Sequence, residues 1–214
     1  MTRHPQADAS RRVKPLPCKA PEVRALLGGR KTQMRIPLKP QPDHCHRDII
    51  GKPRPWTDDD WNRLIPQLGD REVKLPYAPG DLLWVREAWG YFGGSEYLYQ
   101  RDPDAVGFRA DHSVLSPIPG GRWRPSIHMP RWASRITLAV EVVKVERLRD
   151  ISEDEAKAEG APPFTGALQS YRTGFYHIWQ SLHGPGSWEA NPWVCALTFR
   201  VHRCNVDQLA EAAR

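Results

Sequence analysis

Prolines and glycines divide this chain into short regular elements and long loops. The sequence has 21 prolines and 16 glycines in 214 residues, and proline breaks helix interiors and removes a backbone donor from sheets. Prolines recur from Ile36 to Pro79, and glycines and prolines together recur over residues 90 to 130. The simplest prediction is one compact domain in which these two stretches are long loop insertions.

The residues before Lys31 predict a short helix. Pro21 suits the first turn, Glu22 complements the positive end of the helix dipole, and Gly28 stops the helix. One apolar face is formed by Val23, Leu26 and Leu27. Lys31 therefore follows a helix end and enters a short basic strand.

Three segments have the composition and alternation of strands. The first is 82–87, the second runs from about Ser134 to Arg147, and the third is 193–201. In the second, the apolar residues first fall at even positions and then at odd positions, which predicts a bulge: Ile136, Leu138, Val140 and Val142, followed by Val143 and Val145. Strands that bend in this way are typical of a barrel.

Two further helices are predicted in the second half of the chain. Ser152 and Glu155 form a capping box, so a short helix is expected to reach Glu159 and stop at Gly160. The next helix ends near Gly184 and presents an apolar stripe of Phe175, Ile178, Trp179 and Leu182. Within the two proline-rich stretches, 58–64 predicts a short helix and 97–99 a short strand. The fold class expected is α+β, a small mixed β-barrel flanked by short helices.

The positive net charge of the chain favours an anionic partner. The formal net charge is +6 and the pI is near 9.3, and clustered Lys and Arg gain free energy by displacing counterions from phosphates. A merely solvated basic surface explains the charge equally well. Residues 1–13 are predicted to be a disordered basic arm, 14–203 the single domain, and 204–214 a C-terminal tail.

The cysteines predict no disulfide and no metal centre. None of the four forms a CxxC pair, and the chain has no apolar leader or run long enough to span a bilayer, so we expect a reducing cytoplasmic location and no membrane partner. His44, Cys45 and His46 are adjacent in a proline-rich stretch and cannot all face one ion. We expect neither a metal nor another cofactor.

The tryptophans fall into two groups. Three lie in or beside basic loops, the mixture that single-stranded nucleic acids use for stacking and phosphate contact: Trp89, Trp123 and Trp132, with Arg86, Arg122, Arg124 and Arg131. Burial of these loops against the domain is the alternative explanation, and it applies also to His128. Trp84, Trp179 and Trp193 fall on strand or helix stripes and are expected in the core.

Four motifs in one order resemble an ASCH domain of the PUA-like superfamily over about residues 14 to 203. They are the segments 20–33, 80–87, 151–160 and 193–201. The block 123–135, Trp-Arg-Pro-Ser-Ile-His-Met-Pro-Arg-Trp-Ala-Ser-Arg, is similar to phage and prophage versions.

The resemblance implies a small β-barrel with a cleft for RNA or a nucleotide. Some relatives are hydrolases that remove an acyl group from N4-acylated cytidine with a lysine, a threonine and a glutamate. By motif position the lysine is Lys31 and the glutamate is Glu159, whereas the threonine position holds Met34. A thioether cannot replace an activated hydroxyl.

Two functional hypotheses follow. The first is an RNA- or nucleotide-binding module of a mobile genetic element, in which Arg30, Lys31 and Arg35 contact phosphate or base. The second is a hydrolase that deacylates a pyrimidine nucleoside or cleaves RNA, with Lys31 and Glu159 as general acid and base. A plain ion pair that joins a strand to a helix is the structural alternative. The ligand is expected to be RNA, a nucleotide or a single-stranded nucleic acid, and the sequence predicts no oligomeric state.

Overall fold

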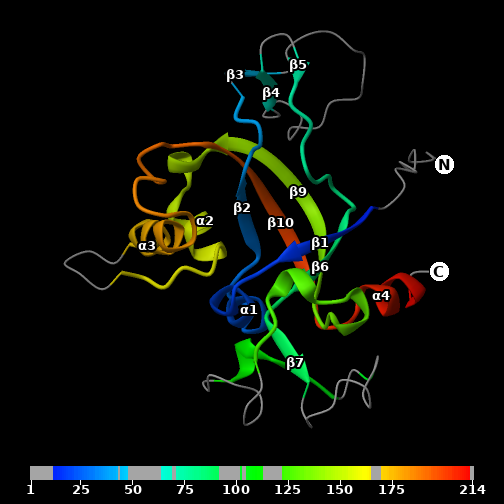
Figure 1. Ribbon diagram of the computed structural model, residues 1–214. Helices are drawn as coiled ribbons and strands as arrows, with labels where there is room; N and C mark the ends of the chain where they lie inside the picture. The colour runs from blue at the N-terminus through cyan, green and yellow to red at the C-terminus, as the bar shows by residue number, and fades with distance from the viewer. Residues whose placement is uncertain are drawn as a thin grey trace, which may run out of the picture. The chain divides into compact units, whose positions relative to one another are not determined.

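The computed structural model describes residues 12–42, 44–47, 64–68, 71–91, 102, 105–112, 122–164 and 170–212. The fold is α+β (Figure 1). The largest sheet has the order β1-β6-β9-β10-β2, with bounds β1 Val13–Pro17, β6 Leu82–Arg86, β9 Thr137–Arg147, β10 Trp193–His202 and β2 Gln33–Pro37. The chain forms two compact units: unit 1 takes its described residues from Met1–Gly29, Gly80–Val140 and Arg200–Arg214, and unit 2 from Arg30–Pro79 and Glu141–Phe199.

Unit 1 is built on parallel pairing of β1 with β6 and antiparallel pairing of β6 with β9. Helix α1, Ala20–Leu27, has Pro21 in its first turn, and Glu22 accepts a hydrogen bond from the Lys19 N–H at 2.8 Å. Gly28 ends the helix, as the sequence predicts. Helix α4, Val206–Ala212, lies in the segment predicted as a tail, and its Val206 is buried with Leu82 and Trp84.

Two parts of unit 1 differ from the sequence expectation. Arg12 pairs with Asp81 at 2.8 Å, and its carbonyl accepts a hydrogen bond from Leu82, so the fold begins within the predicted arm. The predicted second loop contains a hairpin of β7, Trp89–Tyr91, with β8, Val106–Phe108. It also holds 3₁₀ turns η3 Arg109–Asp111, η4 Ser126–His128 and η5 Arg131–Ala133. The predicted strand at 97–99 lies outside the described residues.

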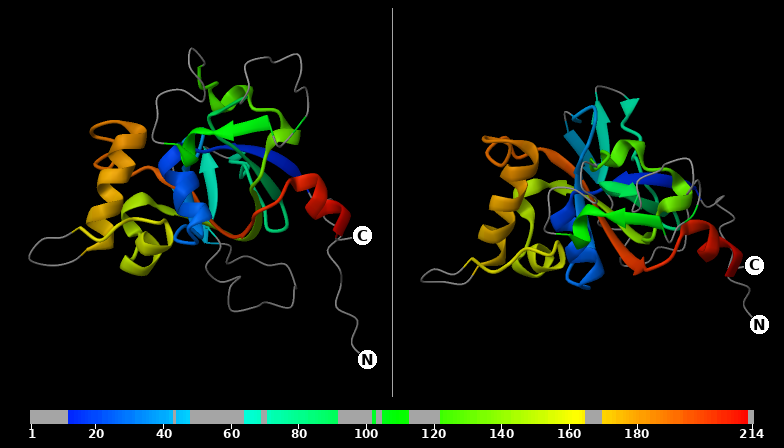
Figure 2. Two further views of the ribbon diagram at one scale, coloured as in Figure 1. Left: turned by 90° about the horizontal axis from the view of Figure 1, so that it is seen from below. Right: turned by 60° about the horizontal axis from the view of Figure 1, so that its bottom comes forward.

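Unit 2 pairs β2 with β10 in antiparallel register, Leu197 opposite Met34 and Thr198 opposite Gln33. Turn η6, Leu148–Asp150, leads to helix α2, Glu153–Ala158, and then to helix α3, Tyr171–His183. Ser152 and Glu155 form the predicted capping box, and Gly184 ends α3 as predicted. The two helices lie side by side (Figures 1 and 2), and α3 buries Phe175 and Trp179.

The predicted first loop also contains strands. Antiparallel pairs join β3, His44–Arg47, to β4, Leu64–Leu68, and β4 to β5, Arg71–Glu72. The helix predicted over 58–64 is described only at Leu64, which begins a strand, so the prediction is wrong there. Pairing with a strand distant in the sequence overrides a weak local preference.

The long strand β9, drawn as a curved arrow in Figure 1, changes its buried face along its length. Ile136, Leu138 and Val140 are buried, and Val145 is buried in the opposite parity, as predicted. Val142 is 54% exposed, so the change of face begins earlier than the sequence predicts.

The described strands of the large sheet run from β1 at one edge to β2 at the other, and no pairing between these two closes them into a ring. None of the described helices has both the length and the apolar content needed to cross a bilayer.

Candidate functional site

Backbone pairing places Lys31 opposite Glu159. The two residues form an isolated antiparallel bridge just before β2 begins. The next residue, Thr32, donates its N–H to the Ala158 carbonyl at 2.8 Å and accepts from the Phe199 N–H at 3.1 Å. Lys31 is therefore held by backbone contacts to the end of α2 on one side and to β10 on the other.

Glu159 owes its position to the end of a short helix. The capping box at Ser152 starts α2, and Glu159 is its C-terminal cap, with its N–H bonded to the Glu155 carbonyl at 2.9 Å. Gly160 follows at φ +80°, a left-handed conformation that glycine adopts without steric cost. The chain turns away there, and the Glu159 side chain stays against Lys31.

Lys31 and Glu159 form a buried ion pair. The Lys31 Nζ lies 2.6 Å from Glu159 Oε2 and also donates to the Glu159 carbonyl at 3.1 Å. The side chains are only 6% and 2% exposed. Removing two charged groups from water costs free energy, and the close contact between the opposite charges offsets part of that cost.

Arg35 adds a second cation, two strand positions beyond Gln33. Its NH1 lies 3.2 Å from Glu159 Oε1, its Nε donates to Glu146 at 2.8 Å, and its NH2 lies 3.1 Å from Glu155. The guanidinium has no solvent exposure. Its donors are therefore directed to carboxylates inside the unit.

Lys144 completes a charge-balanced group. Its Nζ lies 2.6 Å from Glu146 and 3.3 Å from Glu155. Burial lowers the pKa of Lys144, but its hydrogen bond and charge interaction with Glu146 outweigh this and raise it. Three cations thus face three carboxylates, and we call this set the polar network: Lys31, Arg35, Lys144, Glu146, Glu155 and Glu159.

Two neutral polar side chains border the network. Gln33 donates to Thr198 Oγ1 at 3.2 Å, and its Oε1 lies 3.5 Å from Arg35 NH1. Both are partly buried. The sequence analysis missed them, although polar residues at alternate positions 31, 33 and 35 of a strand indicate one polar face.

No hydroxyl contacts the Lys31–Glu159 pair among the described residues. Met34 is 6% exposed and lies opposite Leu197 in the sheet, in strand alternation with Gln33 and Arg35. Thr32 is exposed at the surface. The site offers lysine, arginine and glutamate side chains, and no hydroxyl lies next to the pair within the described part of the chain.

The residues predicted to bind nucleic acid occupy different environments. In unit 2, Arg30 is exposed, whereas Arg35 is enclosed in the polar network. In unit 1, Arg86 is partly buried, donates to the Ser126 carbonyl at 3.0 Å, and stands over the Trp84 ring at 5.5 Å. Arg86 therefore joins β6 to the turn that carries His128.

The Trp89 loop is packed as well as basic. Trp89 is 3% exposed in a cluster with Val106, Phe108, Met129 and Ala133, and Trp132 packs partly buried against it. The Arg124 guanidinium stands 5.2 Å from the Trp89 ring centroid. These contacts agree with the alternative explanation of the tryptophans, in which the loop is buried against its domain. The basic groups remain at the surface of the loop.

His128 and Arg131 are exposed on the same segment. Arg131 pairs with Asp207 of α4, and the two side chains are 44% and 55% exposed. An exposed pair of this kind is weak and easily exchanged for another anion. The core prediction is confirmed for Trp84 and Trp179, whereas Trp193 is only partly buried.

Comparison with family models, curated proteins and solved structures finds no match to this chain. In the part of the chain that the structure describes, no three His, Cys, Asp or Glu side chains gather as metal ligands.

Proposed function

We propose that the protein binds RNA or a nucleotide in a basic cleft marked by Lys31, as an ASCH/PUA-like protein of phage or prophage origin whose sheet belongs to a PUA-like barrel. The observation that carries the proposal is the buried Lys31–Glu159 pair, joined at 2.6 Å and lacking a neighbouring hydroxyl. Such a site can recognise a ligand without the nucleophile that acyl transfer needs.

The hydrogen-bonding capacity of the pair supports recognition of a base. An ammonium has three N–H donors, and Glu159 accepts two of those of Lys31. Among the described residues no other acceptor takes the third. A carboxylate has about four lone-pair sites, and Lys31 and Arg35 use one on each oxygen. A donor beside an acceptor matches the edge of a nucleobase.

The surface of unit 1 supports contact with phosphate. His128 and Arg131 are exposed, and Arg124 is partly exposed over the Trp89 ring. The Arg124 guanidinium and the Trp89 ring thus place a positive charge beside an aromatic ring, a combination that single-stranded nucleic acids use for phosphate contact and stacking. Trp132 adds a partly exposed ring for stacking.

The alternative is a hydrolase acting on N4-acylated cytidine nucleosides or cleaving RNA. The direct contact of Lys31 with Glu159 favours it, since a proton can pass between groups at this distance. Because Met34 holds the position where relatives carry threonine, water is the nucleophile in such a reaction. The hydrolase is the second candidate because the charges of the polar network neutralise one another, which favours binding over proton transfer.

The binding proposal is tested with a single-stranded RNA oligonucleotide at increasing salt. The dissociation constant is expected to rise steeply with salt, as counterion release requires. Lys31→Met is expected to weaken binding roughly tenfold, the effect of one charge-assisted hydrogen bond. Lys39→Met removes an exposed lysine from the same unit and is the matched control. Affinity that does not change with salt, or equal effects of the two variants, would reject the proposal.

The hydrolase alternative is tested separately. Purified protein is incubated with N4-acetylcytidine and with a labelled RNA, beside the Lys31→Met variant. Turnover that disappears in the variant supports the alternative. No turnover of either substrate removes it, and turnover that survives in the variant shows that other residues act.

A further inference from the structure

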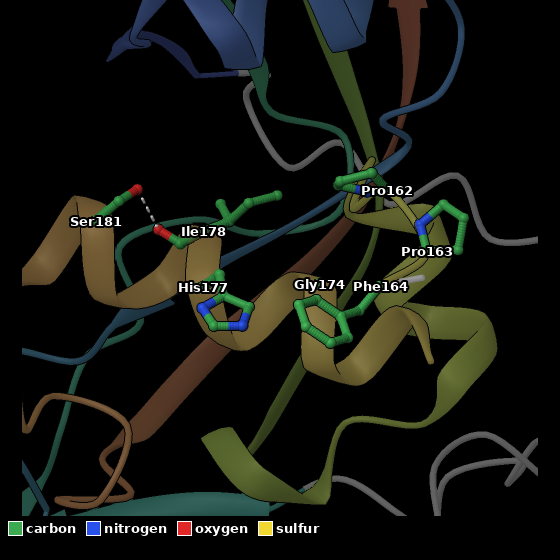
Figure 3. Close-up of a pocket in the computed structure, with 7 residues that line it drawn as sticks. All are labelled: Pro162, Pro163, Phe164, Gly174, His177, Ile178 and Ser181. Carbon is green, nitrogen blue, oxygen red and sulfur yellow. Dashed lines mark hydrogen bonds between the residues drawn. The ribbon is translucent and has the colours of Figure 1, made fainter. Parts of the chain in front are cut away.

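Unit 2 contains a hollow of about 370 Å³ beside α3 that the polar network does not use. One side is formed by the consecutive residues Pro162, Pro163 and Phe164. The other side is formed by successive turns of α3, at Gly174, His177, Ile178 and Ser181 (Figure 3). We call this space the α3 hollow. Its volume lies at the low end of ligand sites and suits one ring system rather than a large cofactor.

The two sides of the α3 hollow are fixed to each other. A Cβ on Gly174 would lie 2.0 Å from the Pro162 carbonyl oxygen, so the helix and the proline segment pack backbone to backbone. The Phe164 N–H donates to the Ser170 carbonyl at 3.1 Å, just before α3 begins. The hollow therefore exists before any ligand arrives, which reduces the entropic cost of binding.

Two aromatic rings lie next to each other at the hollow (Figure 3). The centroids of Phe164 and His177 are 5.3 Å apart, with an angle of 29° between their planes. Phe164 is 47% exposed, and it is one of three large apolar side chains that are exposed in the described part of the chain. Exposed aromatic surface in a concave, rigid setting is typical of a site that stacks a flat ligand.

The polar atoms of the hollow favour a neutral ring that carries heteroatoms. The imidazole of His177 offers both a donor and an acceptor nitrogen. The Ser181 hydroxyl donates to the Ile178 carbonyl at 2.8 Å, which leaves its lone pairs as acceptors. None of the seven lining residues is an acid, a lysine or an arginine. A charged group would therefore find no counter-ion there.

We infer that the α3 hollow binds a single nucleobase, stacked on Phe164 and hydrogen-bonded by His177. The inference rests on the proposed function, to which it adds a second base subsite within unit 2. The chain connects this subsite to the polar network directly, because Pro162 follows Glu159 by three positions and Gly160 and Ala161 between them are buried. A base in the hollow is a neutral heteroaromatic ring of suitable size, and the basic chain supplies attraction for its phosphate.

The test uses the whole chain with adenosine and cytidine, and phenol and indole as comparison ligands. The His177 imidazole resonances, assigned with a His177→Ala variant, report occupancy by NMR. We expect both nucleosides to shift these resonances. Phe164→Ala should weaken nucleoside binding roughly tenfold, the scale of one lost base–aromatic stack, and Phe164→Tyr should restore it. Val142→Ala truncates a similarly exposed apolar residue of unit 2 outside the hollow and should have no effect.

The outcomes separate this inference from the proposed function. One outcome is RNA binding that depends on salt and Lys31 while nucleosides cause no shift of the His177 resonances. That result overturns nucleobase binding in the α3 hollow and supports the proposed function. Nucleoside binding in the hollow without RNA binding supports the base subsite and overturns the proposed RNA-binding function. Shifts caused by phenol and indole but by neither nucleoside overturn the inference in favour of an aromatic side chain of a protein partner.

Discussion

Replacing Lys31 by methionine is the most informative perturbation of the polar network. The variant keeps side-chain length and removes the ammonium 2.6 Å from Glu159 Oε2. It leaves two cations facing three carboxylates, of which Glu146 and Glu159 are buried. Breaking a buried ion pair by removing one partner costs about 3–5 kcal/mol. We expect a loss near the lower end, about 3 kcal/mol, because Arg35 NH1 still lies 3.2 Å from the other oxygen of Glu159.

The double variant Lys31→Met/Glu159→Leu decides whether charge balance is the cause. It leaves Arg35 and Lys144 facing Glu146 and Glu155, so the remaining charges balance again. Replacing a buried pair by apolar side chains is often neutral. The double variant is therefore expected to be more stable than the single variant, within about 1 kcal/mol of the parent protein.

Urea unfolding at neutral pH, followed by circular dichroism, measures both effects. With a slope of about 2 kcal/mol/M, a loss of about 3 kcal/mol lowers the midpoint by about 1.5 M. Lys39→Met is the control, since Lys39 is exposed, and its effect should stay below about 0.5 kcal/mol. A Lys31→Met midpoint equal to that of the control, or a double variant less stable than the single one, would refute the reasoning.

Three further predictions concern other residues. Gly174→Ala should destabilise the protein by about 1–3 kcal/mol in the same urea assay, because its Cβ would lie 2.0 Å from the Pro162 carbonyl oxygen. Burial acts to raise the pKa of Glu155, but a backbone hydrogen bond and neighbouring cations lower it below 4.5. The stability that ionised Glu155 contributes is therefore complete above pH 4.5 and is lost as pH falls through the lower folded-state pKa. Glu155→Gln should reduce this loss of stability in acid titrations. Burial raises the pKa of the Cys195 thiol to about 12, so alkylation at mildly basic pH with peptide mapping should label the partly exposed Cys204 first.

The first two of these predictions have control variants, and the third compares two cysteines within the same protein. Gln180→Ala changes the same helix without adding volume at a contact, so stability equal to that of Gly174→Ala contradicts the packing argument. Glu189→Gln removes an exposed carboxylate outside the polar network and is the control for Glu155→Gln. An unaltered acid transition in Glu155→Gln, or equal labelling rates for Cys195 and Cys204, contradicts the other two.

Elements with local signals were predicted well from the sequence. Helix α1 has Pro21 in its first turn and ends at Gly28, and the capping box at Ser152 starts α2. Strand β6 lies where β-prone residues predict it, and β10 lies where alternation predicts it. These signals depend on residues within a few positions of one another, so no partner element is needed to interpret them.

Elements that depend on distant partners were missed. The sheet of β3, β4 and β5 and the hairpin of β7 and β8 lie in stretches predicted as loops. Pro66 of β4 pairs with Cys45, although proline removes a backbone donor. Pairing across such separations is decided by which strands meet, and a single-sequence pattern does not contain that information.

The sequence by itself determined the helix that precedes Lys31, the polar alternation around Gln33, and the absence of a hydroxyl at Met34. Resemblance to a family suggested Glu159 as a partner, but only the tertiary structure placed the two side chains 2.6 Å apart, across 128 positions of the chain. The basic sequence around Arg35 made this residue a candidate for ligand contact. Only the structure showed that carboxylates from β9 and from the α2 segment surround it. The physical reason is that whether a charge faces solvent or a counter-ion depends on burial and on distances across the fold, and both arise only when distant segments pack.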